Sequence, residues 1–300
     1  MIVIYETLLS SKLSLITYIM LSLSIISLWF NKQFIIFGGL LLIASICGII
    51  AHILTWQAIL FMILFAYITF LTFNAKSIYI KIISGITVFL CSIMISPLHM
   101  ILGFNNWLIA NQIIISPTSV PYTMFLNFDK PLIGLFILGF SNNYLPLLTN
   151  KTAFIKTLKQ SIPINIFGIL LLFYLSHIFG YIKFDLKFNS FFVIWAINNL
   201  LFSCITEEAL FRGLIQKSIN FALKNYNFGK YIAIFIGSIL FGLTIHYHGG
   251  LIYIILSSIA GLMYGYIYQI TNKIEASILS HFLLNACHFI LFTYPTVANN

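Results

Sequence analysis

The sequence predicts an all-α protein, a polytopic membrane bundle of about eight to ten transmembrane helices. Hydrophobic residues make up 61% of the 300-residue chain, and the mean hydropathy is +1.04. Charged residues make up only 7%, whereas soluble domains carry roughly 25%. Apolar runs of the length that crosses a bilayer, about 20 residues, follow one another along most of the chain.

Ten apolar runs are candidates for membrane spans. Their ranges are 12–30, 34–54, 55–74, 79–102, 131–149, 162–182, 189–206, 229–247, 250–270 and 275–294. The run 131–149 is short enough to be re-entrant or interfacial instead. The segment 103–128 is expected to be a loop, or a loop with a short helix lying on the membrane. Lys156 and Lys159, set among apolar residues, indicate a short amphipathic surface helix.

The basic charge is distributed as in the loops of a membrane protein. The formal net charge is +9, but the lysines are scattered between apolar runs and form no patch typical of nucleic-acid binding. The connections 150–161 and 207–230 carry more basic residues than any other connection, so both are expected in the cytoplasm. We therefore expect a multi-pass protein of a bacterial inner or plasma membrane, with the span 189–206 ending at the cytoplasmic face.

The chain divides by its content of polar groups. Residues 1–150 hold few intramembrane polar groups and are predicted to form an N-terminal transmembrane region of unknown role. Residues 151–300 hold nearly all the candidates for chemistry and are predicted to form the functional domain. The four cysteines lie far apart in apolar runs, where they are typical of small core residues rather than disulfides.

The most unusual stretch is Thr206-Glu207-Glu208-Ala209-Leu210-Phe211-Arg212. It directly follows an apolar run, where ionisable groups are costly and usually functional. On a helix, Glu208 and Arg212 are four residues apart and can pair, whereas Glu207 lies about 100° away. One carboxylate can therefore be neutralised while the other is left to react. A cluster of charges marking the end of a span is the simpler interpretation.

Two further stretches add polar groups to the same half of the chain. His281, Asn285 and His288 follow helical spacing in the last span, so they share a face that must turn toward the bundle interior. Interhelical hydrogen bonding alone would also explain such a face. His246 and His248 lie near the end of another predicted span.

These residue types match the needs of a hydrolase. A carboxylate can act as general base on a water molecule, and an asparagine amide can donate to a developing oxyanion. Two histidines and a glutamate could equally bind zinc with one open position, in which case the ligands would be Glu207, His246 and His281. The residues leave both readings open, so the cofactor is either none or zinc.

Three motifs together resemble the CPBP family of CAAX-protease and bacteriocin-processing membrane proteins, also called the Abi family. They are Glu207-Glu208-x-x-x-Arg212, the stretch from Phe241 to His246, and His281-x-x-x-Asn285. The resemblance covers about residues 160–295. It implies an intramembrane endopeptidase acting on a membrane-anchored substrate, of the CAAX, bacteriocin or C-terminal sorting-tail type.

The resemblance also implies roles for the motif residues. Glu207 would activate water, Glu208 and Arg212 would form a supporting pair, and Asn285 would stabilise the oxyanion. His246 and His281 would line the site. The family's second motif is Phe-x-x-x-His, and this chain has one residue more, so His248 is an alternative to His246; His288 is a possible additional member.

Two other functions remain as alternatives. Buried carboxylates and histidines also serve proton- or ion-coupled transporters, although paired inverted halves are not evident in the sequence. A non-catalytic immunity or scaffold member of the family is the second alternative. Loss of turnover on Glu207→Gln, with the fold retained, would distinguish the protease from both.

Overall fold

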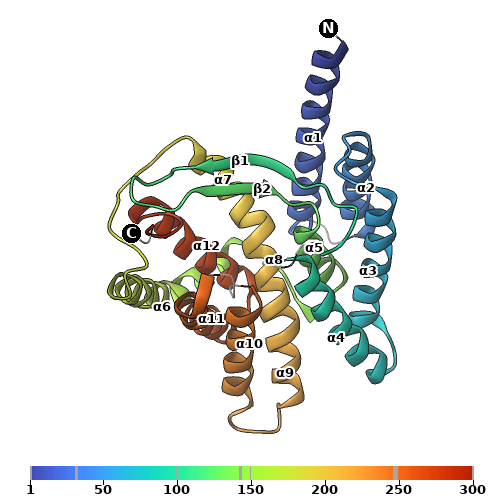
Figure 1. Ribbon diagram of the computed structural model, residues 1–300. Helices are drawn as coiled ribbons and strands as arrows, with labels where there is room; N and C mark the ends of the chain where they lie inside the picture. Colours follow the sequence, from blue (N-terminus) through green and yellow to red (C-terminus); the bar gives the residue numbers. More distant parts are fainter. Residues whose placement is uncertain are drawn as a thin grey trace. The chain divides into compact units, whose positions relative to one another are not determined.

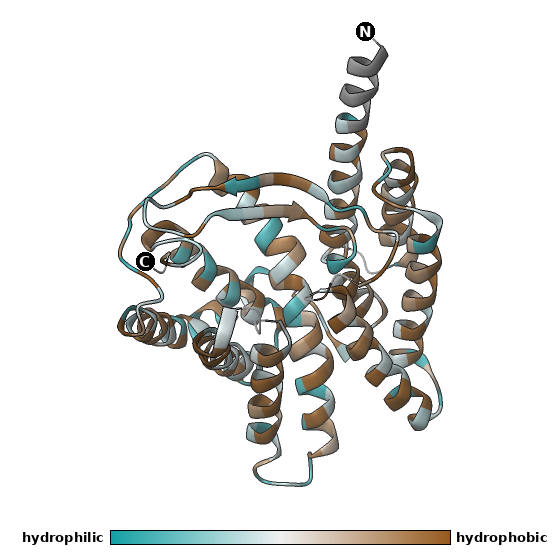
Figure 2. Ribbon diagram, in the orientation of Figure 1, coloured by the Kyte–Doolittle hydropathy of each residue, from teal (hydrophilic) through white to brown (hydrophobic). Residues whose placement is uncertain are grey.

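The structure is a computed structural model that describes residues 2–30, 33–96, 98, 100–141, 144–148, 150–245 and 249–298. Within these residues, six helices are long and apolar enough to cross a membrane: Trp56–Asn74, Ile78–Ile95, Lys151–Ile178, Phe191–Ala222, Gly250–Thr271 and Ile274–Leu291. Four shorter apolar helices accompany them. Figure 2 shows that hydrophobic residues dominate the helices. The predicted all-α, multi-pass membrane bundle is confirmed.

The chain folds as two compact units. One unit comprises residues 1–107 and 125–146, and the other comprises residues 108–124 and 147–300. The first contains α1 (Ile2–Ser27), α2 (Phe34–Ile50), α3 (Trp56–Asn74), α4 (Ile78–Ile95) and α5 (Lys130–Phe140) (Figure 1). The assignment of residues 1–150 and 151–300 as functional domains stays a prediction.

Helix α5 corrects the predicted span 131–149. It has 11 residues, which is about 16 Å of helix, whereas the hydrocarbon core is about 30 Å thick. Its residues from Pro131 to Gly139 are all buried. A helix that is apolar on every side belongs inside a bundle, so this run forms a short internal helix of the first unit.

The second unit is built on one long, segmented helix and four others. The segmented helix comprises α7 (Phe191–Asn198), the π-helix η2 (Asn199–Cys204), α8 (Ile205–Glu208), the π-helix η3 (Ala209–Gln216) and α9 (Lys217–Ala222). The others are α6 (Lys151–Ile178), α10 (Gly229–Ile245), α11 (Gly250–Thr271) and α12 (Ile274–Leu291). In Figure 1 a turn links α9 to α10, which lies beside it.

Two predicted boundaries in this unit are wrong. The span expected to end at residue 206 continues to Ala222, because the polar residues beyond it are buried by neighbouring helices instead of meeting water. The separate surface helix expected near Lys156 and Lys159 is the first part of α6, which continues past Pro163.

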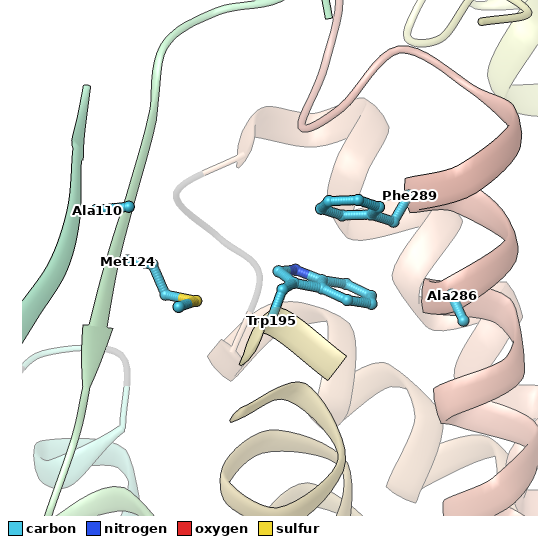
Figure 3. Packing of buried hydrophobic residues seen from close by; sticks show 5 residues of the cluster. All are labelled: Ala110, Met124, Trp195, Ala286 and Phe289. Atoms are coloured by element: carbon cyan, nitrogen blue, oxygen red, sulfur yellow. The ribbon is translucent and has the colours of Figure 1, made fainter. Parts of the chain in front are cut away.

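The segment 103–128 contains a β-hairpin, which corrects the expectation of a loop or a short surface helix. Strand β1 (Trp107–Ile113) pairs with β2 (Tyr122–Leu126), and both are rich in the aromatic and branched residues that favour strands. In the second unit, Ala110 and Met124 face a buried cluster with Trp195, Ala286 and Phe289 (Figure 3). The hairpin therefore packs on both α7 and α12.

The carboxyl-terminal segment closes the same end of the second unit. Thr293 N donates to Lys183 O at 2.8 Å, and Val297 N donates to Tyr181 O at 3.1 Å. Ala298 N donates to Thr118 O at 2.9 Å, so residues 292–298 lie between the 181–187 connection and the hairpin turn. An ion pair between Lys187 Nζ and Asp185 Oδ2, 3.2 Å apart, lies in this connection.

Candidate active site

The two glutamates lie in the middle of the segmented helix. Glu207 and Glu208 form the end of α8, between the π-helices η2 and η3. Their position is roughly 24 Å from Phe191 at 1.5 Å per residue, and they are only 4% and 0% exposed. π-Helical segments are rare and often occur at functional sites. The carboxylates are therefore buried in the middle of the long helix, and the expectation that they mark the end of a span is wrong.

Glu208 is neutralised by Arg212, as the four-residue spacing predicted. Arg212 Nε lies 3.2 Å from Glu208 Oε2, and Arg212 Nη1 donates to Glu208 Oε1 at 3.3 Å. Arg212 is 1% exposed, and its Nη2 also donates to Gly261 O at 2.7 Å. Its guanidinium carbon is 4.9 Å from the centroid of the Phe241 ring and 5.4 Å from that of Tyr264. Charge, hydrogen bonds and aromatic faces together compensate the burial of this cation.

His281 connects the two carboxylates from α12. Its Nδ1 is 2.9 Å from Glu208 Oε1, and its Nε2 is 3.9 Å from Glu207 Oε2. Tyr264 stacks on the imidazole with ring centroids 4.7 Å apart, while Phe241 meets it edge-on at 5.7 Å. If Nδ1–H donates to Glu208, Nε2 is left as an acceptor that faces Glu207.

The formal charges of this group do not cancel. Two carboxylates and one guanidinium leave a net charge of −1 when His281 is neutral. Burial at low dielectric makes an uncompensated charge costly, so the cluster depends on the ion pair and the hydrogen bonds described above.

A ladder of hydrogen bonds fixes the register between the segmented helix and α11. Arg212 Nη2 donates to Gly261 O, Gln216 Nε2 donates to Gly265 O at 2.9 Å, and the Asn220 amide bonds to the Gln269 amide at 3.4 Å. Each pair is separated by 49 residues, so the helices run parallel. Glycines at 261 and 265 allow this approach, because a Cβ at Gly265 would lie 2.8 Å from Gln216 Oε1.

Asn285 and His288 line a cavity beside this cluster. The cavity is about 80 Å³ and lies between α6, α10, α11 and α12, with Phe241 and Tyr264 in its wall. Asn285 Nδ2 donates to Asn199 Oδ1 at 3.2 Å, and His288 Nε2 is 3.2 Å from Thr293 O. The polar face predicted for the last span therefore turns toward the bundle interior, as expected.

The structure does not describe every predicted site residue. His246 and His248 lie outside the described residues, so the second-motif position stays a prediction. Glu207 and His281 face each other, but within the described ranges no group of three or more His, Cys, Asp or Glu could hold a metal ion. The assignment of Glu207, His246 and His281 as zinc ligands also stays a prediction.

Sequence reasoning missed two members of the site. Tyr264 stacks on His281, but a tyrosine in an apolar run carries no signal of its own. Asn199 accepts from Asn285 and also from Cys204 Sγ at 3.3 Å. Its spacing from the glutamates does not follow an α-helical period, because η2 intervenes.

The fold and the site define a helical bundle, with helices long and apolar enough to cross a membrane, that buries a cluster of ionisable side chains. Residues 189–287 match the family of type II CAAX prenyl endopeptidases described as Rce1-like. This match, over about a third of the chain, confirms the resemblance of its motifs and supports an intramembrane protease in general terms. The matched range includes both glutamates, Arg212, His281 and Asn285. Searches of curated proteins and of solved structures found no match.

Proposed function

We propose that the protein is an intramembrane endopeptidase that hydrolyses a peptide bond of a membrane-associated protein, with Glu207 as the general base. The proposal rests on one observation: the two glutamates make different contacts. Glu208 is held by Arg212 and by His281 Nδ1. Glu207 instead faces His281 Nε2 across 3.9 Å, which is too long for a direct hydrogen bond. A water molecule could donate to both atoms.

The proposed reaction uses five side chains. Glu207 takes a proton from the water, and the hydroxide attacks the carbonyl carbon of the scissile bond. Asn285 donates a hydrogen bond to the resulting oxyanion. The proton then passes to the amide nitrogen, the C–N bond breaks, and an acid and an amine are released. His281 positions the water, and the Glu208–Arg212 pair holds the imidazole.

The substrate is expected to be anchored in or on the bilayer, because Glu207 and His281 lie on helices that are long and apolar enough to cross a membrane. CAAX-type, bacteriocin-type and C-terminal sorting-tail proteins are the candidate classes implied by the family. We place the site on the cytoplasmic side of a bacterial membrane, since Lys217, Lys224 and Lys230 surround the nearby α9–α10 turn.

Cleavage by matched variants tests the proposal. Wild type and Glu207→Gln are purified in detergent and incubated with a pool of prenylated CAAX-type, bacteriocin-leader and tail peptides, with products read by mass spectrometry. Glu207→Gln is expected to lose about 10²–10⁴-fold in rate with an unchanged melting temperature. Glu275→Gln is the control, since Glu275 is also a buried glutamate of this unit but bonds to Leu148 N. Full cleavage by Glu207→Gln would refute the mechanism.

Chelation in the same assay distinguishes a water activated without metal from a zinc-bound water. Insensitivity to chelators, with no metal detected in the active protein, would support a water activated by Glu207 alone. Loss of cleavage on chelation, restored by zinc, would instead support Glu207, His246 and His281 as zinc ligands. In that case zinc would lower the pKa of the bound water.

A further inference from the structure

The side chain of Asn199 lies at the proposed oxyanion donor, although no motif includes it. Its Oδ1 accepts from Asn285 Nδ2 at 3.2 Å and from Cys204 Sγ at 3.3 Å. Two donors on different helices therefore converge on one amide oxygen. Both partners lie close to the proposed site: Cys204 is buried three residues before Glu207, and Asn285 lines the cavity.

The π-helix η2 accounts for the position of Asn199. It begins at Asn199 and ends at Cys204, five residues later. In an α-helix, five residues turn 500°, which places the two side chains about 140° apart. Hydrogen bonds from i to i+5 bring residues at this spacing close to one face. The observed Cys204–Asn199 bond requires this geometry, so η2 turns Asn199 toward α12.

The hydrogen bond restricts the direction of the Asn285 amide. An asparagine NH₂ group has two hydrogens in fixed positions in the amide plane. One is directed to Asn199 Oδ1 at 3.2 Å, and Cys204 Sγ, itself bonded to Asn199, lies 3.8 Å from the same nitrogen. The amide plane, and with it the direction of the second hydrogen, is thereby set. Without Asn199, the amide could rotate about its terminal torsion, which has broad preferences. Preorganised donors are what make oxyanion stabilisation effective, because they need no reorganisation during the reaction.

We propose that Asn199 is a positioning residue that orients the Asn285 carboxamide toward the oxyanion. This inference rests on the proposed function, in which Asn285 donates to that oxyanion. It assigns a role to η2 as well, because the local change of helical period brings Asn199 into contact with Asn285 of α12. Asn199 itself does not touch the substrate.

The test compares Asn199→Leu with a matched variant on the same helix. Leucine has a similar size and makes no hydrogen bond. Asn220→Leu is the control, because Asn220 is also half-buried and bonds to an amide of a neighbouring helix, at the far end from η2. The probe is whichever peptide of the pool above the wild type cleaves. Asn199→Leu is expected to lower kcat by about 10- to 100-fold, less than removal of a whole donor, while KM changes less than about twofold. Asn220→Leu is expected to leave both unchanged.

A double-mutant cycle separates positioning from general destabilisation. Asn199→Leu should add nothing to the loss of kcat caused by Asn285→Ala, because its proposed effect on the reaction passes through Asn285. Independent losses that multiply in the double variant would overturn the proposal. So would a rise in KM at constant kcat, or an equal loss in Asn220→Leu.

Wild type, Asn199→Leu, Asn285→Ala and the double variant are also unfolded in detergent, a measurement that needs no substrate. The proposal expects the effects of Asn199→Leu and Asn285→Ala on the unfolding midpoint to be non-additive, and additivity overturns it. If wild type cleaves no peptide of the pool, the proposed function has failed its own test. Non-additive unfolding would then still support the orientation of Asn285 by Asn199.

Discussion

Replacing Arg212 by methionine tests the energetics of the buried cluster. Methionine keeps much of the side-chain length and removes the charge. Glu208, which is 0% exposed, would lose its counter-ion. Removing one partner of a buried ion pair costs about 3–5 kcal/mol. Gly261 O would also lose its hydrogen bond from Arg212, which costs about 1–3 kcal/mol for a buried group. Arg212→Met is therefore expected to lower the free energy of unfolding by at least about 4 kcal/mol.

The measurement is reversible unfolding in mixed detergent micelles, followed by circular dichroism. Lys159→Met is the control, because Lys159 is exposed at the start of α6. Glu208→Gln combined with Arg212→Met removes both charges and should be more stable than Arg212→Met alone, since no uncompensated charge remains. A cost below about 1 kcal/mol for Arg212→Met, as found for exposed ion pairs, would refute the reasoning that this pair is desolvated.

Three further variants test other parts of the second unit. Gly242→Ala would place a Cβ 2.7 Å from Ile254 O, so it should separate α10 from α11 and destabilise the protein by about 1–3 kcal/mol in the same unfolding assay. Trp195→Ala removes a side chain that is 1% exposed and should cost about 3–5 kcal/mol, with limited proteolysis detecting release of the hairpin. Burial raises the pKa of Asp185, but hydrogen bonds and the charge of Lys187 outweigh it, so the folded pKa lies below 3.8. Its contribution is therefore present above pH 3.8 and lost as pH falls through the lower folded value. Asp185→Asn should not show this loss of stability in acid, which is worth less than about 1 kcal/mol. The melting temperature of both proteins, measured against pH, checks it.

Local spacing was enough to predict the contacts that lie within one regular helix. The pairing of Glu208 with Arg212 follows from a separation of four residues, and the inward face of His281 and Asn285 follows from the same period. Hydropathy also identified the bundle. These predictions succeed because each depends on one helix and on the cost of exposing polar groups to lipid.

Features that depend on neighbouring elements were not predicted. The span ending at residue 206 was wrong because Arg212 and Gln216 are satisfied by carbonyls of α11, which hydropathy cannot register. The hairpin at residues 107–126 was missed because its strands pair with each other and pack on residues far away in the chain. Asn199 was missed because η2 changes the helical period locally.

The depth of the carboxylates has a consequence for a hydrolase, because water is its second substrate. Glu207 lies near the midpoint of a 32-residue helix and is 4% exposed, so each turnover of the proposed reaction needs a water molecule that has entered the interior of the bundle. The cavity lined by Phe241, Tyr264 and Asn285, about 80 Å³ in volume, is large enough for several water molecules. Delivery of water through this cavity would then limit the rate under dehydrating conditions. Turnover should accordingly fall with water activity when an excluded osmolyte is added, even at saturating peptide.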